Sequence, residues 1–247
     1  MQQEVTPGRR SRDADALRAA FGREGCPVCT VTFEYVELLI DSWEYEGFSD
    51  IEHRHELIRS RGFCPLHTWQ LAQRSNAFRL GLIYSEVLAD VVQELHHNYN
   101  RLATPDGAVS KHKSLFDGWW RRWRHQADEH PAHTQCPLCR SRATIEQRLI
   151  STLVQQLHAE EIRTLFSQST GLCLLHFAQA RQQAEAVDPP VLRHLLACQL
   201  TCIQRVLGEV RELVRKHDYR FSNEPRGNEM TSWRRAAQLC AGNRGVR

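Results

Sequence analysis

The sequence has no long apolar run. No segment holds about eighteen consecutive uncharged apolar residues, the length that a membrane-spanning helix requires. Residues 1–20 are rich in arginine and aspartate and lack the apolar stretch of a secretory signal. We therefore expect a cytoplasmic protein with a flexible N-terminus over residues 1–20.

The common catalytic signatures are also missing. The chain has no phosphate-binding glycine loop and no Gly-x-Ser-x-Gly elbow. A zinc protease needs two histidines four residues apart with a glutamate after the first, and His53, His55 and Glu56 do not have that order. The sequence names no reaction and favours a protein that is not an enzyme.

No stretch alternates apolar and polar residues as a half-buried strand does. Apolar residues make up 41% of the chain and charged residues 25%, which indicates a folded globular protein. The net charge of +3 is too small to identify a class of partner. Apolar residues instead recur at helical steps of three and four, so the predicted fold is all-α, a bundle with about four helices in each half.

Cysteine, in contrast, is abundant. The chain has nine cysteines, an odd number, so disulfides cannot pair all of them. In a reducing compartment, cysteines and histidines at short regular spacings indicate metal ligation.

The cysteines form a pattern that occurs twice. A CPxC element at Cys26–Cys29 precedes a G-F-C-x-x-H element at Gly62–His67. The second copy has CPxC at Cys136–Cys139 and G-L-C-x-x-H at Gly171–His176. The CPxC elements are 110 positions apart and the CxxH elements 109, so the chain is predicted to be internally duplicated.

Each half is expected to bind one metal ion through three cysteines and one histidine. The predicted ligands are Cys26, Cys29, Cys64 and His67 in the first half, and Cys136, Cys139, Cys173 and His176 in the second. Four sulfur and nitrogen ligands complete a tetrahedron without an open position, which is typical of structural zinc. These ligand types also leave open an iron–sulfur cluster or thiol redox chemistry.

The repeat divides the chain into five segments. We predict a first helical repeat at 21–103, a linker with a helical insert at 104–134, a second repeat at 135–217 and a tail at 218–247, after the N-terminal segment 1–20. In the linker, Trp119–His125 combines aromatic and basic residues that nucleic acid or an anionic membrane could bind. Docking of its tryptophans onto the bundle is the interpretation we favour.

Three cysteines lie outside the repeated pattern. Cys198 and Cys202 are four residues apart on one helical face, which favours small core residues over a redox pair. Cys240 has no partner at motif spacing and is expected to be a free thiol.

The duplicated motifs occur together with a K-x-D-Y-R-F tail at Lys216–Phe221 and a W-R-R-A segment at Trp233–Ala236. In this combination the chain resembles an uncharacterised bacterial family, a domain of unknown function, over nearly its whole length from Cys26 to Leu239. The resemblance implies no activity. The segment Trp119–Trp123 departs from the pattern of that family.

Three functions follow from these features. The leading interpretation is a non-enzymatic, zinc-stabilised helical scaffold that presents a surface to a protein partner. The second is an iron–sulfur or thiol-based sensor or carrier that uses the same ligands. The third is a nucleic-acid-binding protein that uses Trp119–His125.

Overall fold

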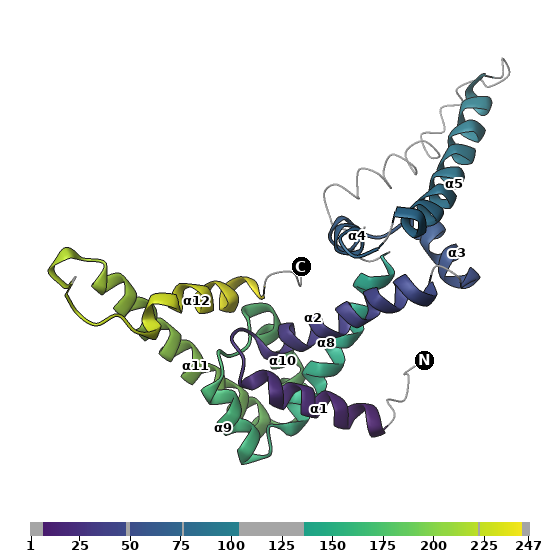
Figure 1. Ribbon diagram of the computed structural model, residues 1–247. Coiled ribbons are helices and arrows are strands. Elements are labelled where there is room, and N and C mark those ends of the chain that lie inside the picture. The colour runs from purple at the N-terminus through teal and green to yellow at the C-terminus, as the bar shows by residue number, and fades with distance from the viewer. Residues whose placement is uncertain (1–6, 48–49, 76, 104–135, 222, 244–247) are drawn as a thin grey trace. The chain divides into compact units, whose positions relative to one another are not determined.

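The computed structural model describes residues 7–47, 50–75, 77–103, 136–221 and 223–243. Within these ranges all regular elements are helices and no strand occurs, so the predicted all-α class is confirmed (Figure 1). None of the helices in these ranges is long and apolar enough to cross a membrane. The predicted linker at 104–134, with its Trp119–His125 segment, lies outside the described residues.

The helices fall into two groups along the chain, labelled as in Figure 1. The first group is α1 (Pro7–Phe21), α2 (Pro27–Ser42), the π-helical turn η1 (Trp43–Gly47), α3 (Ile51–Ser60), α4 (Pro65–Ala72) and α5 (Ala77–Ala103). The second group is α8 (Pro137–Gln156), α9 (Glu160–Gln168), α10 (Leu174–Val187), α11 (Pro189–Lys216), the 3₁₀ turns η2 (Tyr219–Phe221) and η3 (Asn228–Thr231), and α12 (Ser232–Ala241).

The chain divides into two compact units that do not coincide with the two halves of the sequence. Unit 1 contains Met1–Tyr35 and Thr144–Arg247, and unit 2 contains Val36–Ala143. The divisions fall inside α2 and inside α8, so each of these helices contributes residues to both units. Each unit therefore combines residues from the first and the second half of the repeat.

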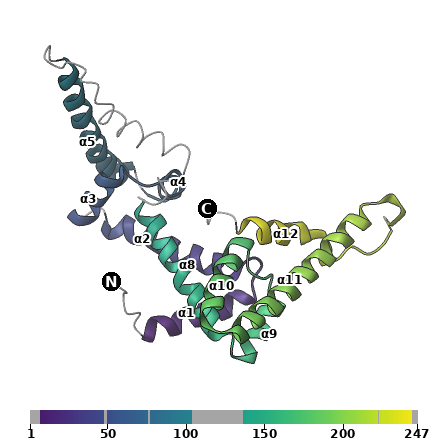
Figure 2. The same cartoon turned by 180° about the vertical axis from the view of Figure 1, so that it is seen from behind.

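Unit 1 contains α1, α9, α10, α11 and the part of α8 from Thr144 onward, which lie together in Figure 2. Phe21 of α1 stacks on Phe166 of α9 with ring centroids 5.7 Å apart. Leu149 and Leu153 of α8 are completely buried, as is Leu195 of α11. Leu149 and Leu153 are four residues apart and lie on one face of α8, so burial of that apolar face favours the packing of α8 in this core.

The N-terminal segment differs from the sequence-based expectation. Flexibility is expected over residues 1–20, but α1 occupies them from Pro7 onward, and Leu17 is fully buried. The buried carboxylate of Asp13 accepts hydrogen bonds from Arg148 of α8 and from Tyr35 of α2. A charged residue, Asp13, is therefore part of the core. The apolar periodicity that would reveal α1 in the sequence is interrupted at this position.

Unit 2 has its own core. Trp43 packs edge-on against Phe63, with centroids 5.2 Å apart, and Ile40, Leu57 and Leu71 are fully buried around them. Asp50 begins α3 by accepting hydrogen bonds from the backbone N–H groups of Glu52 and His53. Ion pairs join α3 to α5: Arg54 with Glu86, and Arg61 with Glu94.

Ion pairs join charged residues at the end of α11 to charged residues of the tail, and further pairs form within each segment. Lys216 lies 2.9 Å from a carboxylate oxygen of Glu229, and Arg215 pairs with Glu212 and Glu224. Asp218 pairs with Arg220. These contacts fasten the tail to the end of α11, and they favour a structural cap over a site lined by tail residues.

The packing of unit 1 predicts a contrast between two leucines. Replacing the fully buried Leu153 of α8 with alanine is expected to lower the free energy of unfolding by about 2–5 kcal/mol, because it leaves a cavity. Leu200 of α11 is 56% exposed, so Leu200→Ala is expected to change it by less than about 1 kcal/mol. Urea denaturation measures both, and equal shifts in the two variants would contradict the observed packing.

Candidate metal centres

The eight predicted ligands gather in two groups of four. Site 1 consists of Cys26, Cys29, Cys173 and His176, and site 2 of Cys64, His67, Cys136 and Cys139. Within each group the four possible ligand atoms all lie within 4.8 Å of one another. Every one of these residues is buried, with Cys139 the most exposed at 4%.

The predicted pairing of the motifs within each half is wrong. Each CPxC element meets the CxxH element of the other half. The reason is the length of the helix that begins at each CPxC: α2 has 16 residues and carries the chain roughly 24 Å from its start. From Val36 onward, its residues belong to unit 2, so the CxxH element that follows lies in unit 2 as well.

All four ligand pairs stand at helix N-termini. Pro27 and Pro137 are the first residues of α2 and α8, so a helix begins within each CPxC element. Cys64 and Cys173 are the N-cap residues of α4 and α10. The free N–H groups at these ends stabilise negative charge on the nearby sulfurs.

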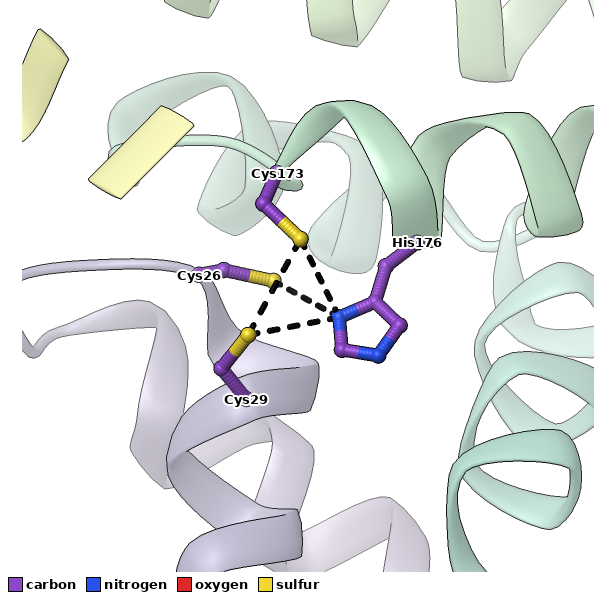
Figure 3. Close-up of side chains that lie close together, drawn as sticks. All are labelled: Cys26, Cys29, Cys173 and His176. Carbon is purple, nitrogen blue, oxygen red and sulfur yellow. Dashed lines mark hydrogen bonds between the residues drawn. The ribbon is translucent and has the colours of Figure 1, made fainter. Parts of the chain in front are cut away.

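In site 1, Nδ1 of His176 faces the three sulfur atoms (Figure 3). It lies 3.5 Å from Sγ of Cys26, 3.4 Å from Sγ of Cys29 and 3.3 Å from Sγ of Cys173. The sulfurs of Cys29 and Cys173 are 3.8 Å apart. An ion with sulfur ligands at about 2.3 Å and a nitrogen ligand at about 2.0 Å has tetrahedral edges of about 3.8 and 3.5 Å. Site 1 therefore fits one tetrahedral metal ion.

Site 2 has the same arrangement. Nδ1 of His67 lies 3.2 Å from Sγ of Cys64, 3.5 Å from Sγ of Cys136 and 3.4 Å from Sγ of Cys139. The sulfurs of Cys139 and Cys64 are 3.5 Å apart. The two sites thus offer the same ligand atoms in nearly the same geometry.

A glycine with positive φ precedes each CxxH element. Gly62 has φ of +92° and Gly171 has φ of +94°, values that other residues rarely adopt. A Cβ on Gly171 would lie 2.8 Å from Cβ of Cys202. These glycines let the chain turn sharply from the preceding helix into the ligand pair.

The cysteines outside the motifs take no part in either group. Sγ of Cys202 donates to the carbonyl of Phe166 at 3.1 Å, and Sγ of Cys198 to that of Arg163 at 3.6 Å. Both residues are buried, in agreement with their interpretation as small core residues, whereas Cys240 is exposed.

Several residues that support site 1 carry no signal in the sequence. A carboxylate oxygen of Glu146 lies 3.5 Å from Nε2 of His176. Asn243 accepts a hydrogen bond from the backbone N–H of Cys26, and Gln199 binds both backbone groups of Leu172. Single polar residues far apart in the chain form no motif, so sequence reasoning misses them.

The imidazole of His176 and the cysteine sulfurs of site 1 form hydrogen bonds with one another. Burial lowers the pKa of His176, but hydrogen bonds with Cys173 and Cys29 outweigh it and raise the pKa to about 11. Hydrogen bonds from Cys26 and Cys29 hold the pKa of Cys173 well below its usual range. A metal ion that binds Nδ1 takes the place of any proton on that nitrogen.

A family model described as "Family of unknown function (DUF6062)" matches residues 15–246. The chain belongs to this family. The resemblance to an uncharacterised family, stated from the motifs, is thereby confirmed. Comparison with curated proteins and with solved structures finds no match.

The crossed pairing predicts which double variants keep a metal ion. Cys64→Ser with Cys136→Ser damages only site 2, so about one tightly bound ion should remain. Cys26→Ser with Cys64→Ser damages both sites, so no tightly bound ion should remain. Elemental analysis after passage over a chelating resin makes the measurement.

The exposed Cys240 supplies the control, because Cys240→Ser should leave metal content unchanged. Pairing within each half would give the reverse result, with one ion kept by the Cys26–Cys64 double variant and none by the Cys64–Cys136 double variant.

Proposed function

We propose that the protein is a non-enzymatic helical scaffold stabilised by two structural zinc ions. The observation that carries the proposal is the pair of buried groups, each with four ligand atoms and no open position for water or substrate. A catalytic zinc site keeps one position free, and three cysteines with one histidine are a typical structural set.

The ligand separations favour a single ion over an iron–sulfur cluster. In a cluster, the cysteine sulfurs bind different iron atoms and are separated by the cluster itself. In this protein all four ligand atoms of each site lie within 4.8 Å of one another, which suits one central ion. Among single ions, zinc prefers this mixture of thiolate and imidazole in a tetrahedron.

Each ion closes a long loop of the chain. Cys29 and Cys173 of site 1 are 144 residues apart, and Cys64 and Cys139 of site 2 are 75 apart. Closing such loops costs conformational entropy, and an ion that binds only the folded chain offsets that cost. The zinc ions thus act as cross-links between the two halves of the sequence.

Two buried cysteines of unit 1 test the structural role. Cys173→Ser removes a ligand of site 1 and should lower the free energy of unfolding by several kcal/mol, or roughly 10 °C in Tm at about 2–4 °C per kcal/mol. Cys202→Ser makes the same change at an equally buried position outside the site, where a hydroxyl can still donate to Phe166, so its effect should be small.

Thermal melts of both variants and of chelator-treated protein make the measurement. Equal melting temperatures in all samples, with loss of the ion verified, would show that the ions are not structural. Visible absorption by anaerobically purified protein would instead support the iron–sulfur alternative.

The surface of the scaffold that meets a protein partner is a stripe on α5. Leu88, Val92, Leu95 and Tyr99 are between 50% and 69% exposed and follow one another at steps of four, three and four residues. This is the spacing of a coiled-coil seam, which packs against another helix. Ile83 and Val87, on another face of α5, are buried in unit 2, so the helix is anchored while the side chains of its stripe are exposed.

Site-specific photo-crosslinking tests this surface. A photoreactive phenylalanine at position 92 should form covalent adducts with a partner protein in cells. The same residue at position 90, where exposed Asp90 lies away from the stripe, should not. Equal adduct formation at both positions, or none at position 92, would contradict the assignment.

A further inference from the structure

The two metal sites have the same ligands but different surroundings. Positions 110 residues apart correspond in the repeat, so Glu146 of α8 corresponds to Val36 of α2. Both residues are buried, Glu146 at 6% exposure and Val36 at 4%. One site therefore has a carboxylate where the other has a hydrocarbon side chain.

Glu146 stands behind the histidine ligand of site 1. Nδ1 of His176 faces the three sulfurs, and the ring turns Nε2 away from them (Figure 3). A carboxylate oxygen of Glu146 lies 3.5 Å from this Nε2. At this distance the contact is electrostatic and is not a hydrogen bond. A carboxylate beside the second ring nitrogen favours a proton on Nε2 and leaves Nδ1 for the metal, and such a partner commonly strengthens metal binding by about 10–100-fold.

The segment after α12 closes site 1 from another direction. The side chain of Asn243 accepts from the N–H of Cys26 at 3.1 Å and donates to the hydroxyl of Thr30 at 3.0 Å. Gly242 lies over the sulfurs, since a Cβ there would be 3.4 Å from Sγ of Cys29 and 3.8 Å from Sγ of Cys173. A chelator must displace these residues to reach the ion.

The two ligand loops of site 1 are also joined to each other. The N–H of Gly25, beside Cys26, donates to the hydroxyl of Thr170 at 3.0 Å. Thr170 lies three residues before Cys173 and is buried. When the ion leaves, this hydrogen bond still holds the ligand loops together, so rebinding is favoured over escape.

Site 2 is supported differently. Val36, at the position that matches Glu146, cannot accept a hydrogen bond. Over the ranges that the structure describes, His67 forms no ion pair with a carboxylate. The counterpart of Thr30 is Arg140, which pairs with Glu56 of α3.

We propose that the two ions differ in lability: site 1 retains its ion, site 2 exchanges its ion, and Glu146 is the positioning residue that makes the difference. This inference rests on the proposed function, since it requires an ion in each site. Site 1 then acts as a permanent cross-link within unit 1. Site 2 is the site whose metal content responds to zinc supply or to a thiol-reactive agent.

Metal release from the full-length protein tests the inference. Protein loaded with two equivalents of Zn²⁺ is mixed with an excess of a chromogenic chelator, and absorbance follows the released ion. We expect two phases of equal amplitude whose rates differ by about tenfold or more. The slow phase should be missing in Cys173→Ser and the fast phase in Cys64→Ser.

The substitution Glu146→Val places a valine beside site 1, as Val36 stands at the matching position of the first half. The slow phase should accelerate by about 10–100-fold while the fast phase keeps its rate. Glu146→Gln retains an acceptor oxygen and should accelerate the slow phase less. The exposed neighbour Gln147 supplies the control, since Gln147→Ala should change neither phase.

The outcomes separate the two proposals. Fewer than two bound ions in the starting protein would refute the zinc scaffold itself. Two ions released in a single phase, or a slow phase that Glu146→Val leaves unchanged, would refute the difference in lability while the scaffold stands. Acceleration of both phases by Glu146→Val would show general destabilisation and would also overturn the role of Glu146.

Discussion

Three thiol groups and an imidazole held together in a buried space form the constraint on which the rest of the structure depends. In each site the ligand atoms are within 4.8 Å of one another, and the residues are at most 4% exposed. Thiolates gathered in this way repel one another and have lost their hydration. A cation at the centre would remove the repulsion, and the N-termini of the surrounding helices would stabilise the negative charge that remains. The N-termini of α2 and α10 meet at site 1, and those of α4 and α8 meet at site 2.

The sequence predicted the eight residues that gather in the two groups, because metal-binding cysteines and histidines follow one another at short, regular spacings. A cysteine or histidine three positions from another places both on one helix turn, and the repetition of CPxC and CxxH showed that the spacing was not accidental. It could not predict which CPxC meets which CxxH, because exchanging the partners leaves all the spacings unchanged. The answer depends on where α2 carries the chain, which is a property of a rigid 16-residue helix and not of any motif.

The sequence pattern predicted the helices with regular apolar faces and missed features that depend on contacts between distant residues. The all-α class was predictable from apolar residues at steps of three and four, as in α5 and α11. Helix α1 was missed because its sequence is dominated by charged residues, and one of these, Asp13, is buried by its contacts with Arg148 and Tyr35. Glu146 was missed because a lone carboxylate in an amphipathic helix carries no signal until the fold brings His176 against it.

The long separation between the partners of each site also has a consequence for protein synthesis. Cys29 leaves the ribosome 144 residues before Cys173, an interval of roughly 7–30 seconds at elongation rates of about 5–20 residues per second. Site 2 gains its last ligand at Cys139 and site 1 only at His176, so the N-terminal half cannot complete a centre by itself while the chain grows. Until the second half is synthesised, the thiols of Cys26 and Cys29 lack the other two residues of their group, and a thiol that is oxidised in that interval could no longer bind a metal ion there.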